Sequence, residues 1–282
     1  MPMHLACRTA FISDTHLGSR GCRAQELARF LKLLRCERIY LVGDIIDMWR
    51  LRSRWYWPAE HNEVVRRILK IAKRGTEVIF VPGNHDEAAR QFHHLEFGGV
   101  KLMPRAIHET ADGRRFLVTH GDQYDLVVRH HPVLSGLGSA AYEVLIGINR
   151  VYNGGRRLIG LPYWSLSQYL KLKVKSACTF ISRFEQTLIE EATRQRLDGV
   201  VCGHIHKAEI REGLRPAYYN CGDWIESCTA LVEHHDGRME LVAALPLLDR
   251  LGPAVAPEAA ADRDEPFEVV VAAEHEMIEV GV

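Results

Sequence analysis

The stretch Arg38-Ile39-Tyr40-Leu41-Val42-Gly43-Asp44-Ile45-Ile46-Asp47 decides the fold of this 282-residue chain. Its first five residues form a short apolar run that ends in glycine and a carboxylate, which predicts a strand buried on both faces. The earlier run 9–13 ends in the same way at Asp14-Thr15-His16, and the later run 77–81 ends at Pro82-Gly83-Asn84-His85-Asp86. Three strands therefore each lead into a polar cluster.

Helical patterns separate these strands. Apolar residues repeat at helical spacing from Arg23 to Leu34, and again from Val64 to Ala72 before Gly75. Strand, helix, strand, helix, strand with apolar strands predicts a layered α/β sheet, whose ligand sites lie beyond the carboxyl ends of the strands. All three polar clusters occupy that position.

Further strands follow along the chain. The run 116–119 precedes His120-Gly121-Asp122, and the run 199–202 precedes Gly203-His204-Ile205-His206. The segments 217–220, 229–233 and 239–243 also read as strands, the last two joined through the hairpin sequence His235-Asp236-Gly237-Arg238. We expect these three strands to form a second sheet.

The net charge of the chain is zero, but basic and acidic residues are concentrated in different segments. Lys+Arg and Asp+Glu both number 36. From Leu126 to Arg183 eight basic residues stand against the single acid Glu143, and from Asp249 onward nine acidic residues stand against two arginines. We predict a main domain over 1–250, interrupted by a basic, aromatic-rich helical lid insertion over 125–176, and an acidic C-terminal tail over 251–282 with a linker and an added edge strand at 267–271.

The composition also excludes several classes of protein. A net charge of zero argues against a binder of duplex nucleic acid. No apolar run reaches the roughly 18 residues of a membrane span, and the N-terminus lacks a signal-peptide pattern. Seven cysteines without a C-x-x-C pair favour reduced thiols. We expect a cytoplasmic protein.

The clusters at the strand ends combine carboxylates with imidazoles. A mixed set of oxygen and nitrogen donors suits divalent manganese, iron or zinc better than calcium. In both Asp14-x-His16 and His204-x-His206 the two side chains would face the same way on an extended segment. Any one of these motifs alone is more often a turn, but five of them at five strand ends in order predict a metal centre.

These five clusters resemble the sequence blocks of the calcineurin-like metallophosphoesterases: D-x-H, G-D-x-x-D, G-N-H-D/E, H and G-H-x-H. The resemblance spans Asp14 to His206 and implies a four-layer fold, in which a two-sheet β-sandwich is flanked by helices and holds two divalent metal ions, manganese first, with iron or zinc as alternatives. The implied ligands are Asp14, His16 and His206 for one metal, Asn84, His120 and His204 for the other, and Asp44 as the bridge.

The same resemblance implies phosphoester hydrolysis by a hydroxide held between the two metals. His85, which is left without a ligand role, would stabilise charge on the phosphoryl group or protonate the leaving oxygen. Asp47 would orient an imidazole such as His85, although a carboxylate at a helix N-terminus is the simpler reading. Asp122 is equally ambiguous.

The second block continues to Met48-Trp49, and this extension is similar to the branch of the family that hydrolyses UDP-2,3-diacylglucosamine in lipid A biosynthesis. That branch also carries a helical lid at the place of the insertion, where Lys171 and Lys175 would meet a pyrophosphate and apolar residues would meet acyl chains. A cap that buries its own apolar face is the alternative. The chain departs from the branch at His85, where the branch has arginine, and this leaves the substrate open.

A second candidate substrate surface follows Trp49. Arg52 and Arg54 lie beside Trp55-Tyr56-Trp57, and arginine with aromatic residues suits a phosphorylated, base-containing substrate. A loop that covers the sheet edge with a buried Trp is the alternative.

The leading hypothesis is thus a hydrolase that cleaves a pyrophosphate or phosphodiester bond of a UDP-linked acylated sugar and releases UMP. The basic insertion extends it to peripheral binding at the anionic inner membrane surface. The alternatives are a phosphodiesterase or phosphatase of soluble nucleotides, or a phosphoesterase fold that binds without turnover. The oligomeric state is not indicated by the sequence.

Overall fold

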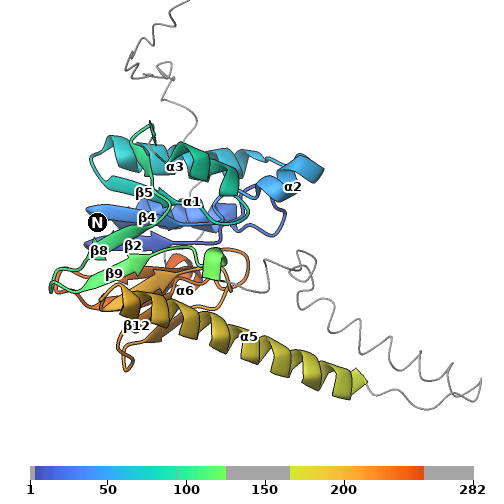
Figure 1. The fold of residues 1–282 in the computed structure, drawn as a ribbon. Coiled ribbons are helices and arrows are strands. Elements are labelled where there is room, and N and C mark those ends of the chain that lie inside the picture. The colour runs from blue at the N-terminus through green and yellow to red at the C-terminus, as the bar shows by residue number, and fades with distance from the viewer. Residues whose placement is uncertain (1–3, 94, 125–165, 251–282) are drawn as a thin grey trace, which may run out of the picture.

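The computed structural model describes residues 4–93, 95–124 and 166–250, with the side chains of the last segment described from residue 180 onward. Two sheets face each other and helices cover both outer faces (Figure 1). The seven-stranded sheet has the order β14 (Met239–Ala243), β13 (Thr229–Glu233), β2 (Thr9–Ile12), β4 (Arg38–Val42), β5 (Glu77–Val81), β7 (Val100–Leu102) and β6 (Glu96–Phe97). The predicted four-layer sandwich is confirmed.

The other sheet has five strands. Its order is β11 (Glu209–Arg211), β12 (Ala217–Asn220), β10 (Gly199–Cys202), β9 (Arg115–Val118) and β8 (Ala106–Glu109). A separate parallel pair is formed by β1 (Leu5–Ala6) and β3 (Leu34–Arg35). Strands β2, β4 and β5 run parallel in one sheet, and β9, β10 and β12 run parallel in the other, so each sheet has several carboxyl ends along one edge.

One expectation about the sheets is wrong. The hairpin β13–β14 does not belong with β12 to a second sheet, because β13 pairs antiparallel with β2, with Leu231 opposite Phe11. The second sheet is built instead around β9, β10 and β12. The sequence of β13 indicates that the strand is buried, but a strand buried along its whole length fits beside several neighbours, so its sequence does not select the partner.

Three apolar layers hold the sandwich together. Helices α1 (Ala24–Leu33), α3 (Ala59–Lys73) and α6 (Ala244–Asp249) pack on the seven-stranded sheet, and α5 (Leu166–Arg194) packs on the five-stranded sheet. Between the sheets, Phe11 stacks on Tyr40 with ring centroids 5.0 Å apart, and Phe116 packs edge-on against Tyr219. The two inner faces are therefore aromatic and dry.

The predicted insertion (125–176) and the predicted C-terminal tail (251–282) fall largely outside the described residues. The structure does not describe 125–165 or 251–282, so the predicted linker and edge strand are not described. The expected lid boundary at residue 176 lies inside α5, which continues to Arg194 and projects beyond the sheets in Figure 1. In the described part of the chain no helix has the length and apolar character needed to cross a membrane. The six described cysteines are free thiols.

A buried carboxylate joins the two sheets. Glu233, at the end of β13, is fully buried and accepts hydrogen bonds from Arg8 (2.8 Å) and from the backbone N–H of Ala111 (2.7 Å). Its Oε2 lies 2.9 Å from Nε2 of His108, which belongs to β8 of the opposite sheet. Burial raises the pKa of Glu233, but these hydrogen bonds, that of His108 first, outweigh burial and lower the pKa to about 2.

The lowered pKa predicts how stability depends on pH. Because the folded-state pKa lies below the ordinary value of 4.5, the stabilisation is complete above about pH 4.5 and is lost as pH falls toward about 2. Glu233→Gln should lower the free energy of unfolding at pH 7 by about 2–5 kcal/mol and flatten its decline in acid. Urea unfolding at several pH values measures both effects.

Glu240→Gln is the matched control for this experiment. Glu240 lies on β14, is 46% exposed and pairs with Arg238 at 2.9 Å, so its replacement should change stability by less than about 1 kcal/mol. Equal effects of the two substitutions would show that Glu233 does not join the sheets.

Candidate metal centre

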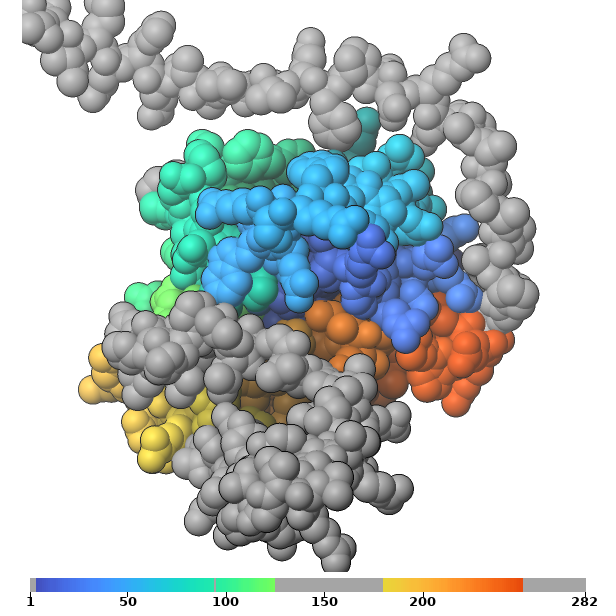
Figure 2. All heavy atoms as spheres, turned by 90° about the vertical axis from the view of Figure 1, so that its right-hand side faces the viewer, coloured from blue at the N-terminus to red at the C-terminus, as the bar shows by residue number. Residues whose placement is uncertain are grey.

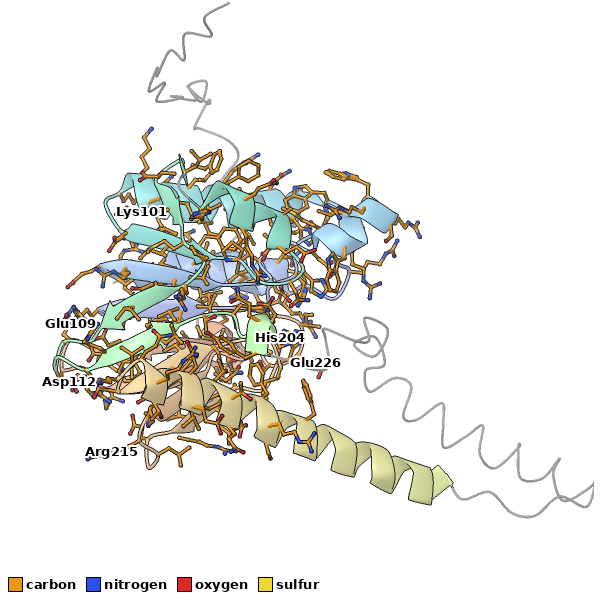
Figure 3. The ribbon with its side chains drawn as sticks, viewed as in Figure 1. Lys101, Glu109, Asp112, His204, Arg215 and Glu226 are labelled. Carbon is orange, nitrogen blue, oxygen red and sulfur yellow. The ribbon has the colours of Figure 1, made fainter. Side chains whose placement is uncertain are left out.

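The carboxyl ends of five strands meet where the two sheets face each other. Asp14, Asp44 and Asn84 follow β2, β4 and β5 of the seven-stranded sheet, and His120 and His204 follow β9 and β10 of the other. His204 lies at the opposite end of the sandwich from Glu109 and Asp112 (Figure 3). Figure 2 views the molecule from this side, with the N-terminal segments above and the segments of the second sheet below.

One group of donors contains Asp14, His16 and His206. Nε2 of His206 lies 3.2 Å from Oδ1 of Asp14 and 3.2 Å from Nε2 of His16. All three can offer a ligand atom within 4.8 Å of one another. Two imidazole nitrogens beside one carboxylate oxygen form a donor set that suits a divalent transition metal.

A second group contains Asp44, His120 and His204, whose ligand atoms also lie within 4.8 Å of one another. Nδ1 of His120 lies 2.9 Å from the carbonyl oxygen of Val42 and therefore carries the proton, which leaves a lone pair on Nε2. That Nε2 lies 3.4 Å from Oδ1 of Asp44. The backbone of β4 thus sets the tautomer that a metal ligand needs.

Three buried polar atoms at this place test whether a metal fits. Oδ1 of Asp14, Oδ1 of Asn84 and Nε2 of His120 are shielded from solvent and make no hydrogen bond. Buried polar atoms without partners are costly and rare in folded proteins. All three belong to residues expected as ligands, and each is a lone-pair donor, so the residues present fit bound cations.

The backbone at these residues departs from the extended conformation that we expected. Asp14 and His16 have φ values of 52° and 49°, and His204 and His206 have φ values of 73° and 53°. These residues lie in the left-handed region, which non-glycine residues seldom adopt and which carries a cost of order 1–3 kcal/mol per residue. The side chains therefore converge because the backbone turns, and not because alternate residues of a strand share a face.

Glycine permits the close approach of the loops. A Cβ on Gly83 would collide with Oδ1 of Asp44, and a Cβ on Gly203 would collide with Oδ2 of Asp14. The backbone N–H of His204 donates to that same Oδ2 at 3.0 Å. The two aspartates are held by the loop that follows another strand.

His85 lies outside the groups that contain Asp14 and Asp44, but with His16 and Asp47 it forms a third group whose ligand atoms lie within 4.8 Å of one another. Its Nδ1 lies 2.9 Å from Oδ1 of Asp47, and its ring packs on Trp49 with centroids 4.2 Å apart. Asp47 also accepts the N–H of Arg50 (2.9 Å) as the N-cap of α2 (Met48–Ser53). Asp47 therefore makes the contacts expected of both readings: it bonds to the His85 imidazole and it caps a helix N-terminus.

Sequence reasoning missed Asp86. This fully buried carboxylate follows β5 and accepts backbone N–H groups of Ile45 (2.7 Å) and Ile46 (3.2 Å), and so joins the loops after β4 and β5. Burial and the charge of Asp44 raise its pKa to about 6. The fourth letter of Gly-Asn-His-Asp was the available signal, but a turn sequence also favours Asp there.

The site has an electrostatic preference for positive charge. Burial raises the pKa of Asp44, but the imidazoles of His120, His16 and His85 hold the pKa well below its usual range. Burial lowers the pKa of His206, but the adjacent Asp14 raises it to about 9. Buried carboxylates that raise imidazole pKa values in this way also attract metal cations.

A family model for calcineurin-like phosphoesterases matches residues 7–208. The chain belongs to the calcineurin-like phosphoesterase family. Curated relatives named UDP-2,3-diacylglucosamine hydrolase include that of Histophilus somni, which is 29% identical over 118 residues, and that of Salmonella agona, which is 25% identical over 249 residues.

The extent of these matches differs. The Histophilus match covers 41% of this chain and 49% of the relative, so the chain spans about half the length of that relative, whereas the Salmonella match covers 82% and 93%. A solved structure of a novel archaeal phosphodiesterase is 13% identical, with a TM-score of 0.40, and covers 83% of this chain and 98% of that chain.

The expected substrate residues of this phosphoesterase differ in their surroundings. Trp49, half-buried, contacts His85, whereas Arg52 and Arg54 are exposed on and after α2. Trp55 is 74% exposed, whereas Trp57 is partly buried and packs against the core of the seven-stranded sheet, as the alternative of a loop anchored by a Trp requires. Asp122 forms an ion pair with Arg90 (2.7 Å). Lys171 and Lys175 fall in the part of α5 whose side chains lie outside the described residues.

Helix α5 contacts the metal centre directly. Phe184 is buried, its ring centroid lies 5.7 Å from that of His204, and a Cβ on Gly121 would collide with it. The neighbouring Glu185, also buried, pairs with Arg211 at 2.9 Å and lies 3.7 Å from Lys207. The C-terminal half of this helix therefore fixes the loop that carries His204 and His206.

Phe184→Ala should weaken metal binding. Loss of the ring removes the packing that orients His204, and such supporting contacts are worth about 10- to 100-fold in metal affinity. Calorimetric titration of the metal-free protein with Mn²⁺ measures the effect.

Leu188→Ala is the matched control, because Leu188 lies one turn further along α5 in the same core and is fully buried. Both substitutions should lower the free energy of unfolding by about 2–5 kcal/mol, but Leu188→Ala should leave the Mn²⁺ affinity unchanged. Equal losses of affinity would mean that Phe184 contributes only to general packing.

Proposed function

We propose that this chain is a metal-dependent phosphoric-ester hydrolase with two divalent cations, manganese first. The observation that supports this most strongly is the coincidence of three buried donor atoms that make no hydrogen bond, on Asp14, Asn84 and His120, with groups of ligand-competent residues. Asp14, His16 and His206 would hold one cation, and Asn84, His120 and His204 the other.

Asp44 is the proposed bridge between the two cations. Its Oδ1 lies 3.4 Å from Nε2 of His120, in one donor group, and its Oδ2 lies 3.8 Å from Nε2 of His16, in the other. One oxygen is therefore available to each group. Two divalent cations in these positions would lower the pKa of a water molecule and offset negative charge on a phosphoryl group.

His85 is the proposed proton donor. Nδ1 of His85 donates a hydrogen bond to Asp47. The other ring nitrogen, Nε2, faces the metal centre and lies 3.9 Å from Oδ2 of Asp44. Burial lowers the pKa of His85, but the hydrogen bond with Asp47 and the charge of Asp44 raise it above its ordinary value. A protonated His85 can stabilise a phosphoryl oxygen or protonate the leaving oxygen.

The proposed substrate is a UDP-linked acylated sugar similar to UDP-2,3-diacylglucosamine, cleaved at its pyrophosphate with release of UMP. Support comes from the names of the curated relatives and from the Trp49 extension beside His85. Arg52, Arg54, Lys171 and Lys175 are the proposed substrate contacts. Histidine rather than arginine at position 85 favours a second candidate, a phosphodiesterase of soluble nucleotides.

The test compares two substrates with Mn²⁺-reconstituted protein. UDP-2,3-diacylglucosamine should yield UMP, and bis-p-nitrophenyl phosphate should yield p-nitrophenol. His85→Ala should lower kcat about 10²- to 10⁴-fold on the lipid substrate, because a proton donor is lost. Asp44→Asn should abolish turnover of both substrates, because the bridging charge is lost.

His234→Ala is the matched control: His234 lies at the β13–β14 hairpin, pairs with Glu240 and should leave both activities unchanged. Turnover of the diester alone would retain the hydrolase and discard the lipid substrate. No turnover of either would contradict hydrolysis and favour a phosphoesterase fold that only binds.

We also propose peripheral binding at an anionic membrane surface, supported by the excess of basic residues from Leu126 to Arg183. The protein should float with vesicles that contain anionic lipid and remain behind with neutral vesicles at low salt. Lys171→Glu together with Lys175→Glu should reduce flotation. Protein that stays wholly in the soluble fraction with anionic vesicles would contradict this proposal.

A further inference from the structure

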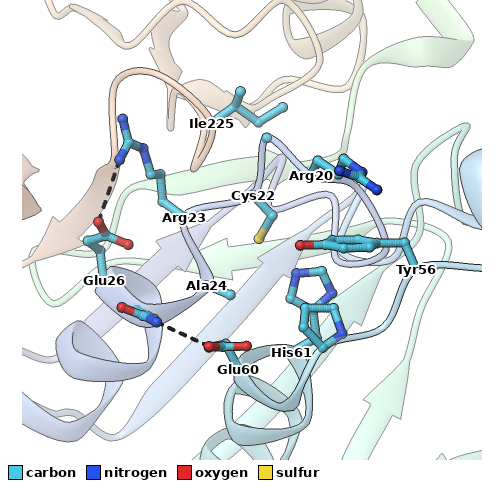
Figure 4. Close-up of a pocket in the computed structure, with 12 residues that line it drawn as sticks. Arg20, Cys22, Arg23, Ala24, Glu26, Tyr56, Glu60, His61 and Ile225 are labelled. Carbon is cyan, nitrogen blue, oxygen red and sulfur yellow. Dashed lines mark hydrogen bonds and ion pairs between the residues drawn. The ribbon is translucent and has the colours of Figure 1, made fainter.

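A pocket of about 520 Å³ contains none of the expected metal ligands, but it includes Tyr56 of the second candidate substrate surface (Figure 4). The loop before α1, the N-terminus of α3 and the segment around Ile225 form its walls. The residues whose chemistry matters are Arg20, Arg23, Glu26, Tyr56, Glu60 and His61.

The pocket walls continue from the backbone that carries two expected ligands. Arg20 comes four residues after His16, and the N–H of Gly18, between them, donates to Nδ1 of His61 at 3.0 Å. On the other wall, Ile225 follows Trp224, whose N–H donates to the carbonyl oxygen of Asp14 at 3.0 Å. The loop that carries Asp14 and His16 is therefore joined to two walls of this pocket by hydrogen bonds of its backbone.

Some charged side chains in the pocket have a polar partner of their own, but Arg20 has no carboxylate beside it among the described residues. Arg23 lies 3.7 Å from Glu26, and Glu60 accepts a hydrogen bond from Gln25 at 3.1 Å. Arg20 has no carboxylate partner among the described residues; its guanidinium lies 5.2 Å from the centroid of the Tyr56 ring. One cation beside one aromatic face remains available to a ligand.

The chemistry of the lining narrows the class of ligand. An acyl chain would need an apolar lining, but most of these side chains are charged or polar. A second phosphate group would need several converging cationic donors, and only Arg20 is uncompensated. A flat, polar heterocycle can stack against a guanidinium and a phenol ring and hydrogen-bond with the surrounding polar groups.

We propose that this pocket binds the nucleoside part of a nucleotide substrate, with the base stacked against the Arg20–Tyr56 pair while the phosphate occupies the metal centre. This inference rests on the proposed function, since it assigns a subsite to the nucleotide portion of that substrate. The pocket then distinguishes nucleotide esters from other phosphate esters.

The test measures binding of UMP and of inorganic phosphate to the Mn²⁺-loaded protein by calorimetry. UMP should bind more tightly than phosphate to the unchanged protein. Tyr56→Ala and Arg20→Ala should each weaken UMP binding about tenfold, in line with the loss of one base-stacking contact, and leave phosphate binding unchanged. Tyr56→Phe, which keeps the ring, should retain most of the UMP affinity.

Arg66→Ala is the control, because Arg66 is exposed on α3 and outside the pocket. Equal binding of UMP by the control and the two alanine variants, or equal affinity of the unchanged protein for UMP and phosphate, would overturn the inference. UMP binding that depends on Arg20 and Tyr56, without UMP release from UDP-2,3-diacylglucosamine, would contradict the proposed substrate while leaving the subsite in place.

Discussion

The concentration of buried carboxylates at one edge of the sandwich is the constraint on which the rest of this structure depends. Asp14, Asp44, Asp47 and Asp86 are each at least 97% buried within a few residues of parallel strand ends. Desolvated negative charges that lie close together must be offset by imidazolium groups, backbone N–H groups or cations. These partners can come close because some loop residues adopt unfavourable φ values and because glycine, which has no Cβ, stands where the loops touch.

The centre also requires that two separate sheets keep their relative position. Asp14 and Asp44 come from one sheet, whereas His120 and His204 come from the other, so a small slide of the sheets would part them. Glu233, which lies beside Thr9 at the start of β2, opposes such a slide at the far end through its contact with His108 of the other sheet. Nδ1 of His120 opposes it at the near end by its contact with the carbonyl group of Val42.

Local patterns along the chain were sufficient to predict most strands, whereas the two-sheet sandwich was implied by the resemblance of the five motifs to a known family. The strands 199–202, 217–220 and 229–233 have the expected bounds, since each is a continuous apolar run bounded by turn residues. The partner of β13 was not predictable, because its five buried residues suit either sheet. The short helix α2 was indicated only by the reading of Asp47 as a carboxylate at a helix N-terminus, because its six residues include no buried one and it lacks an apolar stripe.

The candidate site shows a similar division. The order of the motifs predicted which residues lie together at the site. It did not predict the backbone conformation that brings them together. The left-handed turns at His16 and His206 depend on contacts between loops that are distant in sequence, and histidine itself does not encode them. Asp86 likewise joins two loops by accepting hydrogen bonds from the backbone N–H groups of Ile45 and Ile46, which are about 40 residues away in sequence.

Helix α5 has one more consequence, which concerns how this architecture can diversify. Its last turns, from Phe184 onward, belong to the sandwich, whereas its first turns extend beyond it. The point of attachment for any insertion therefore lies within a continuous helix, upstream of Phe184. The helix thus separates the part of the chain that supports His204 from the part that precedes it, so that a change of sequence before Phe184 need not disturb the ring beside His204.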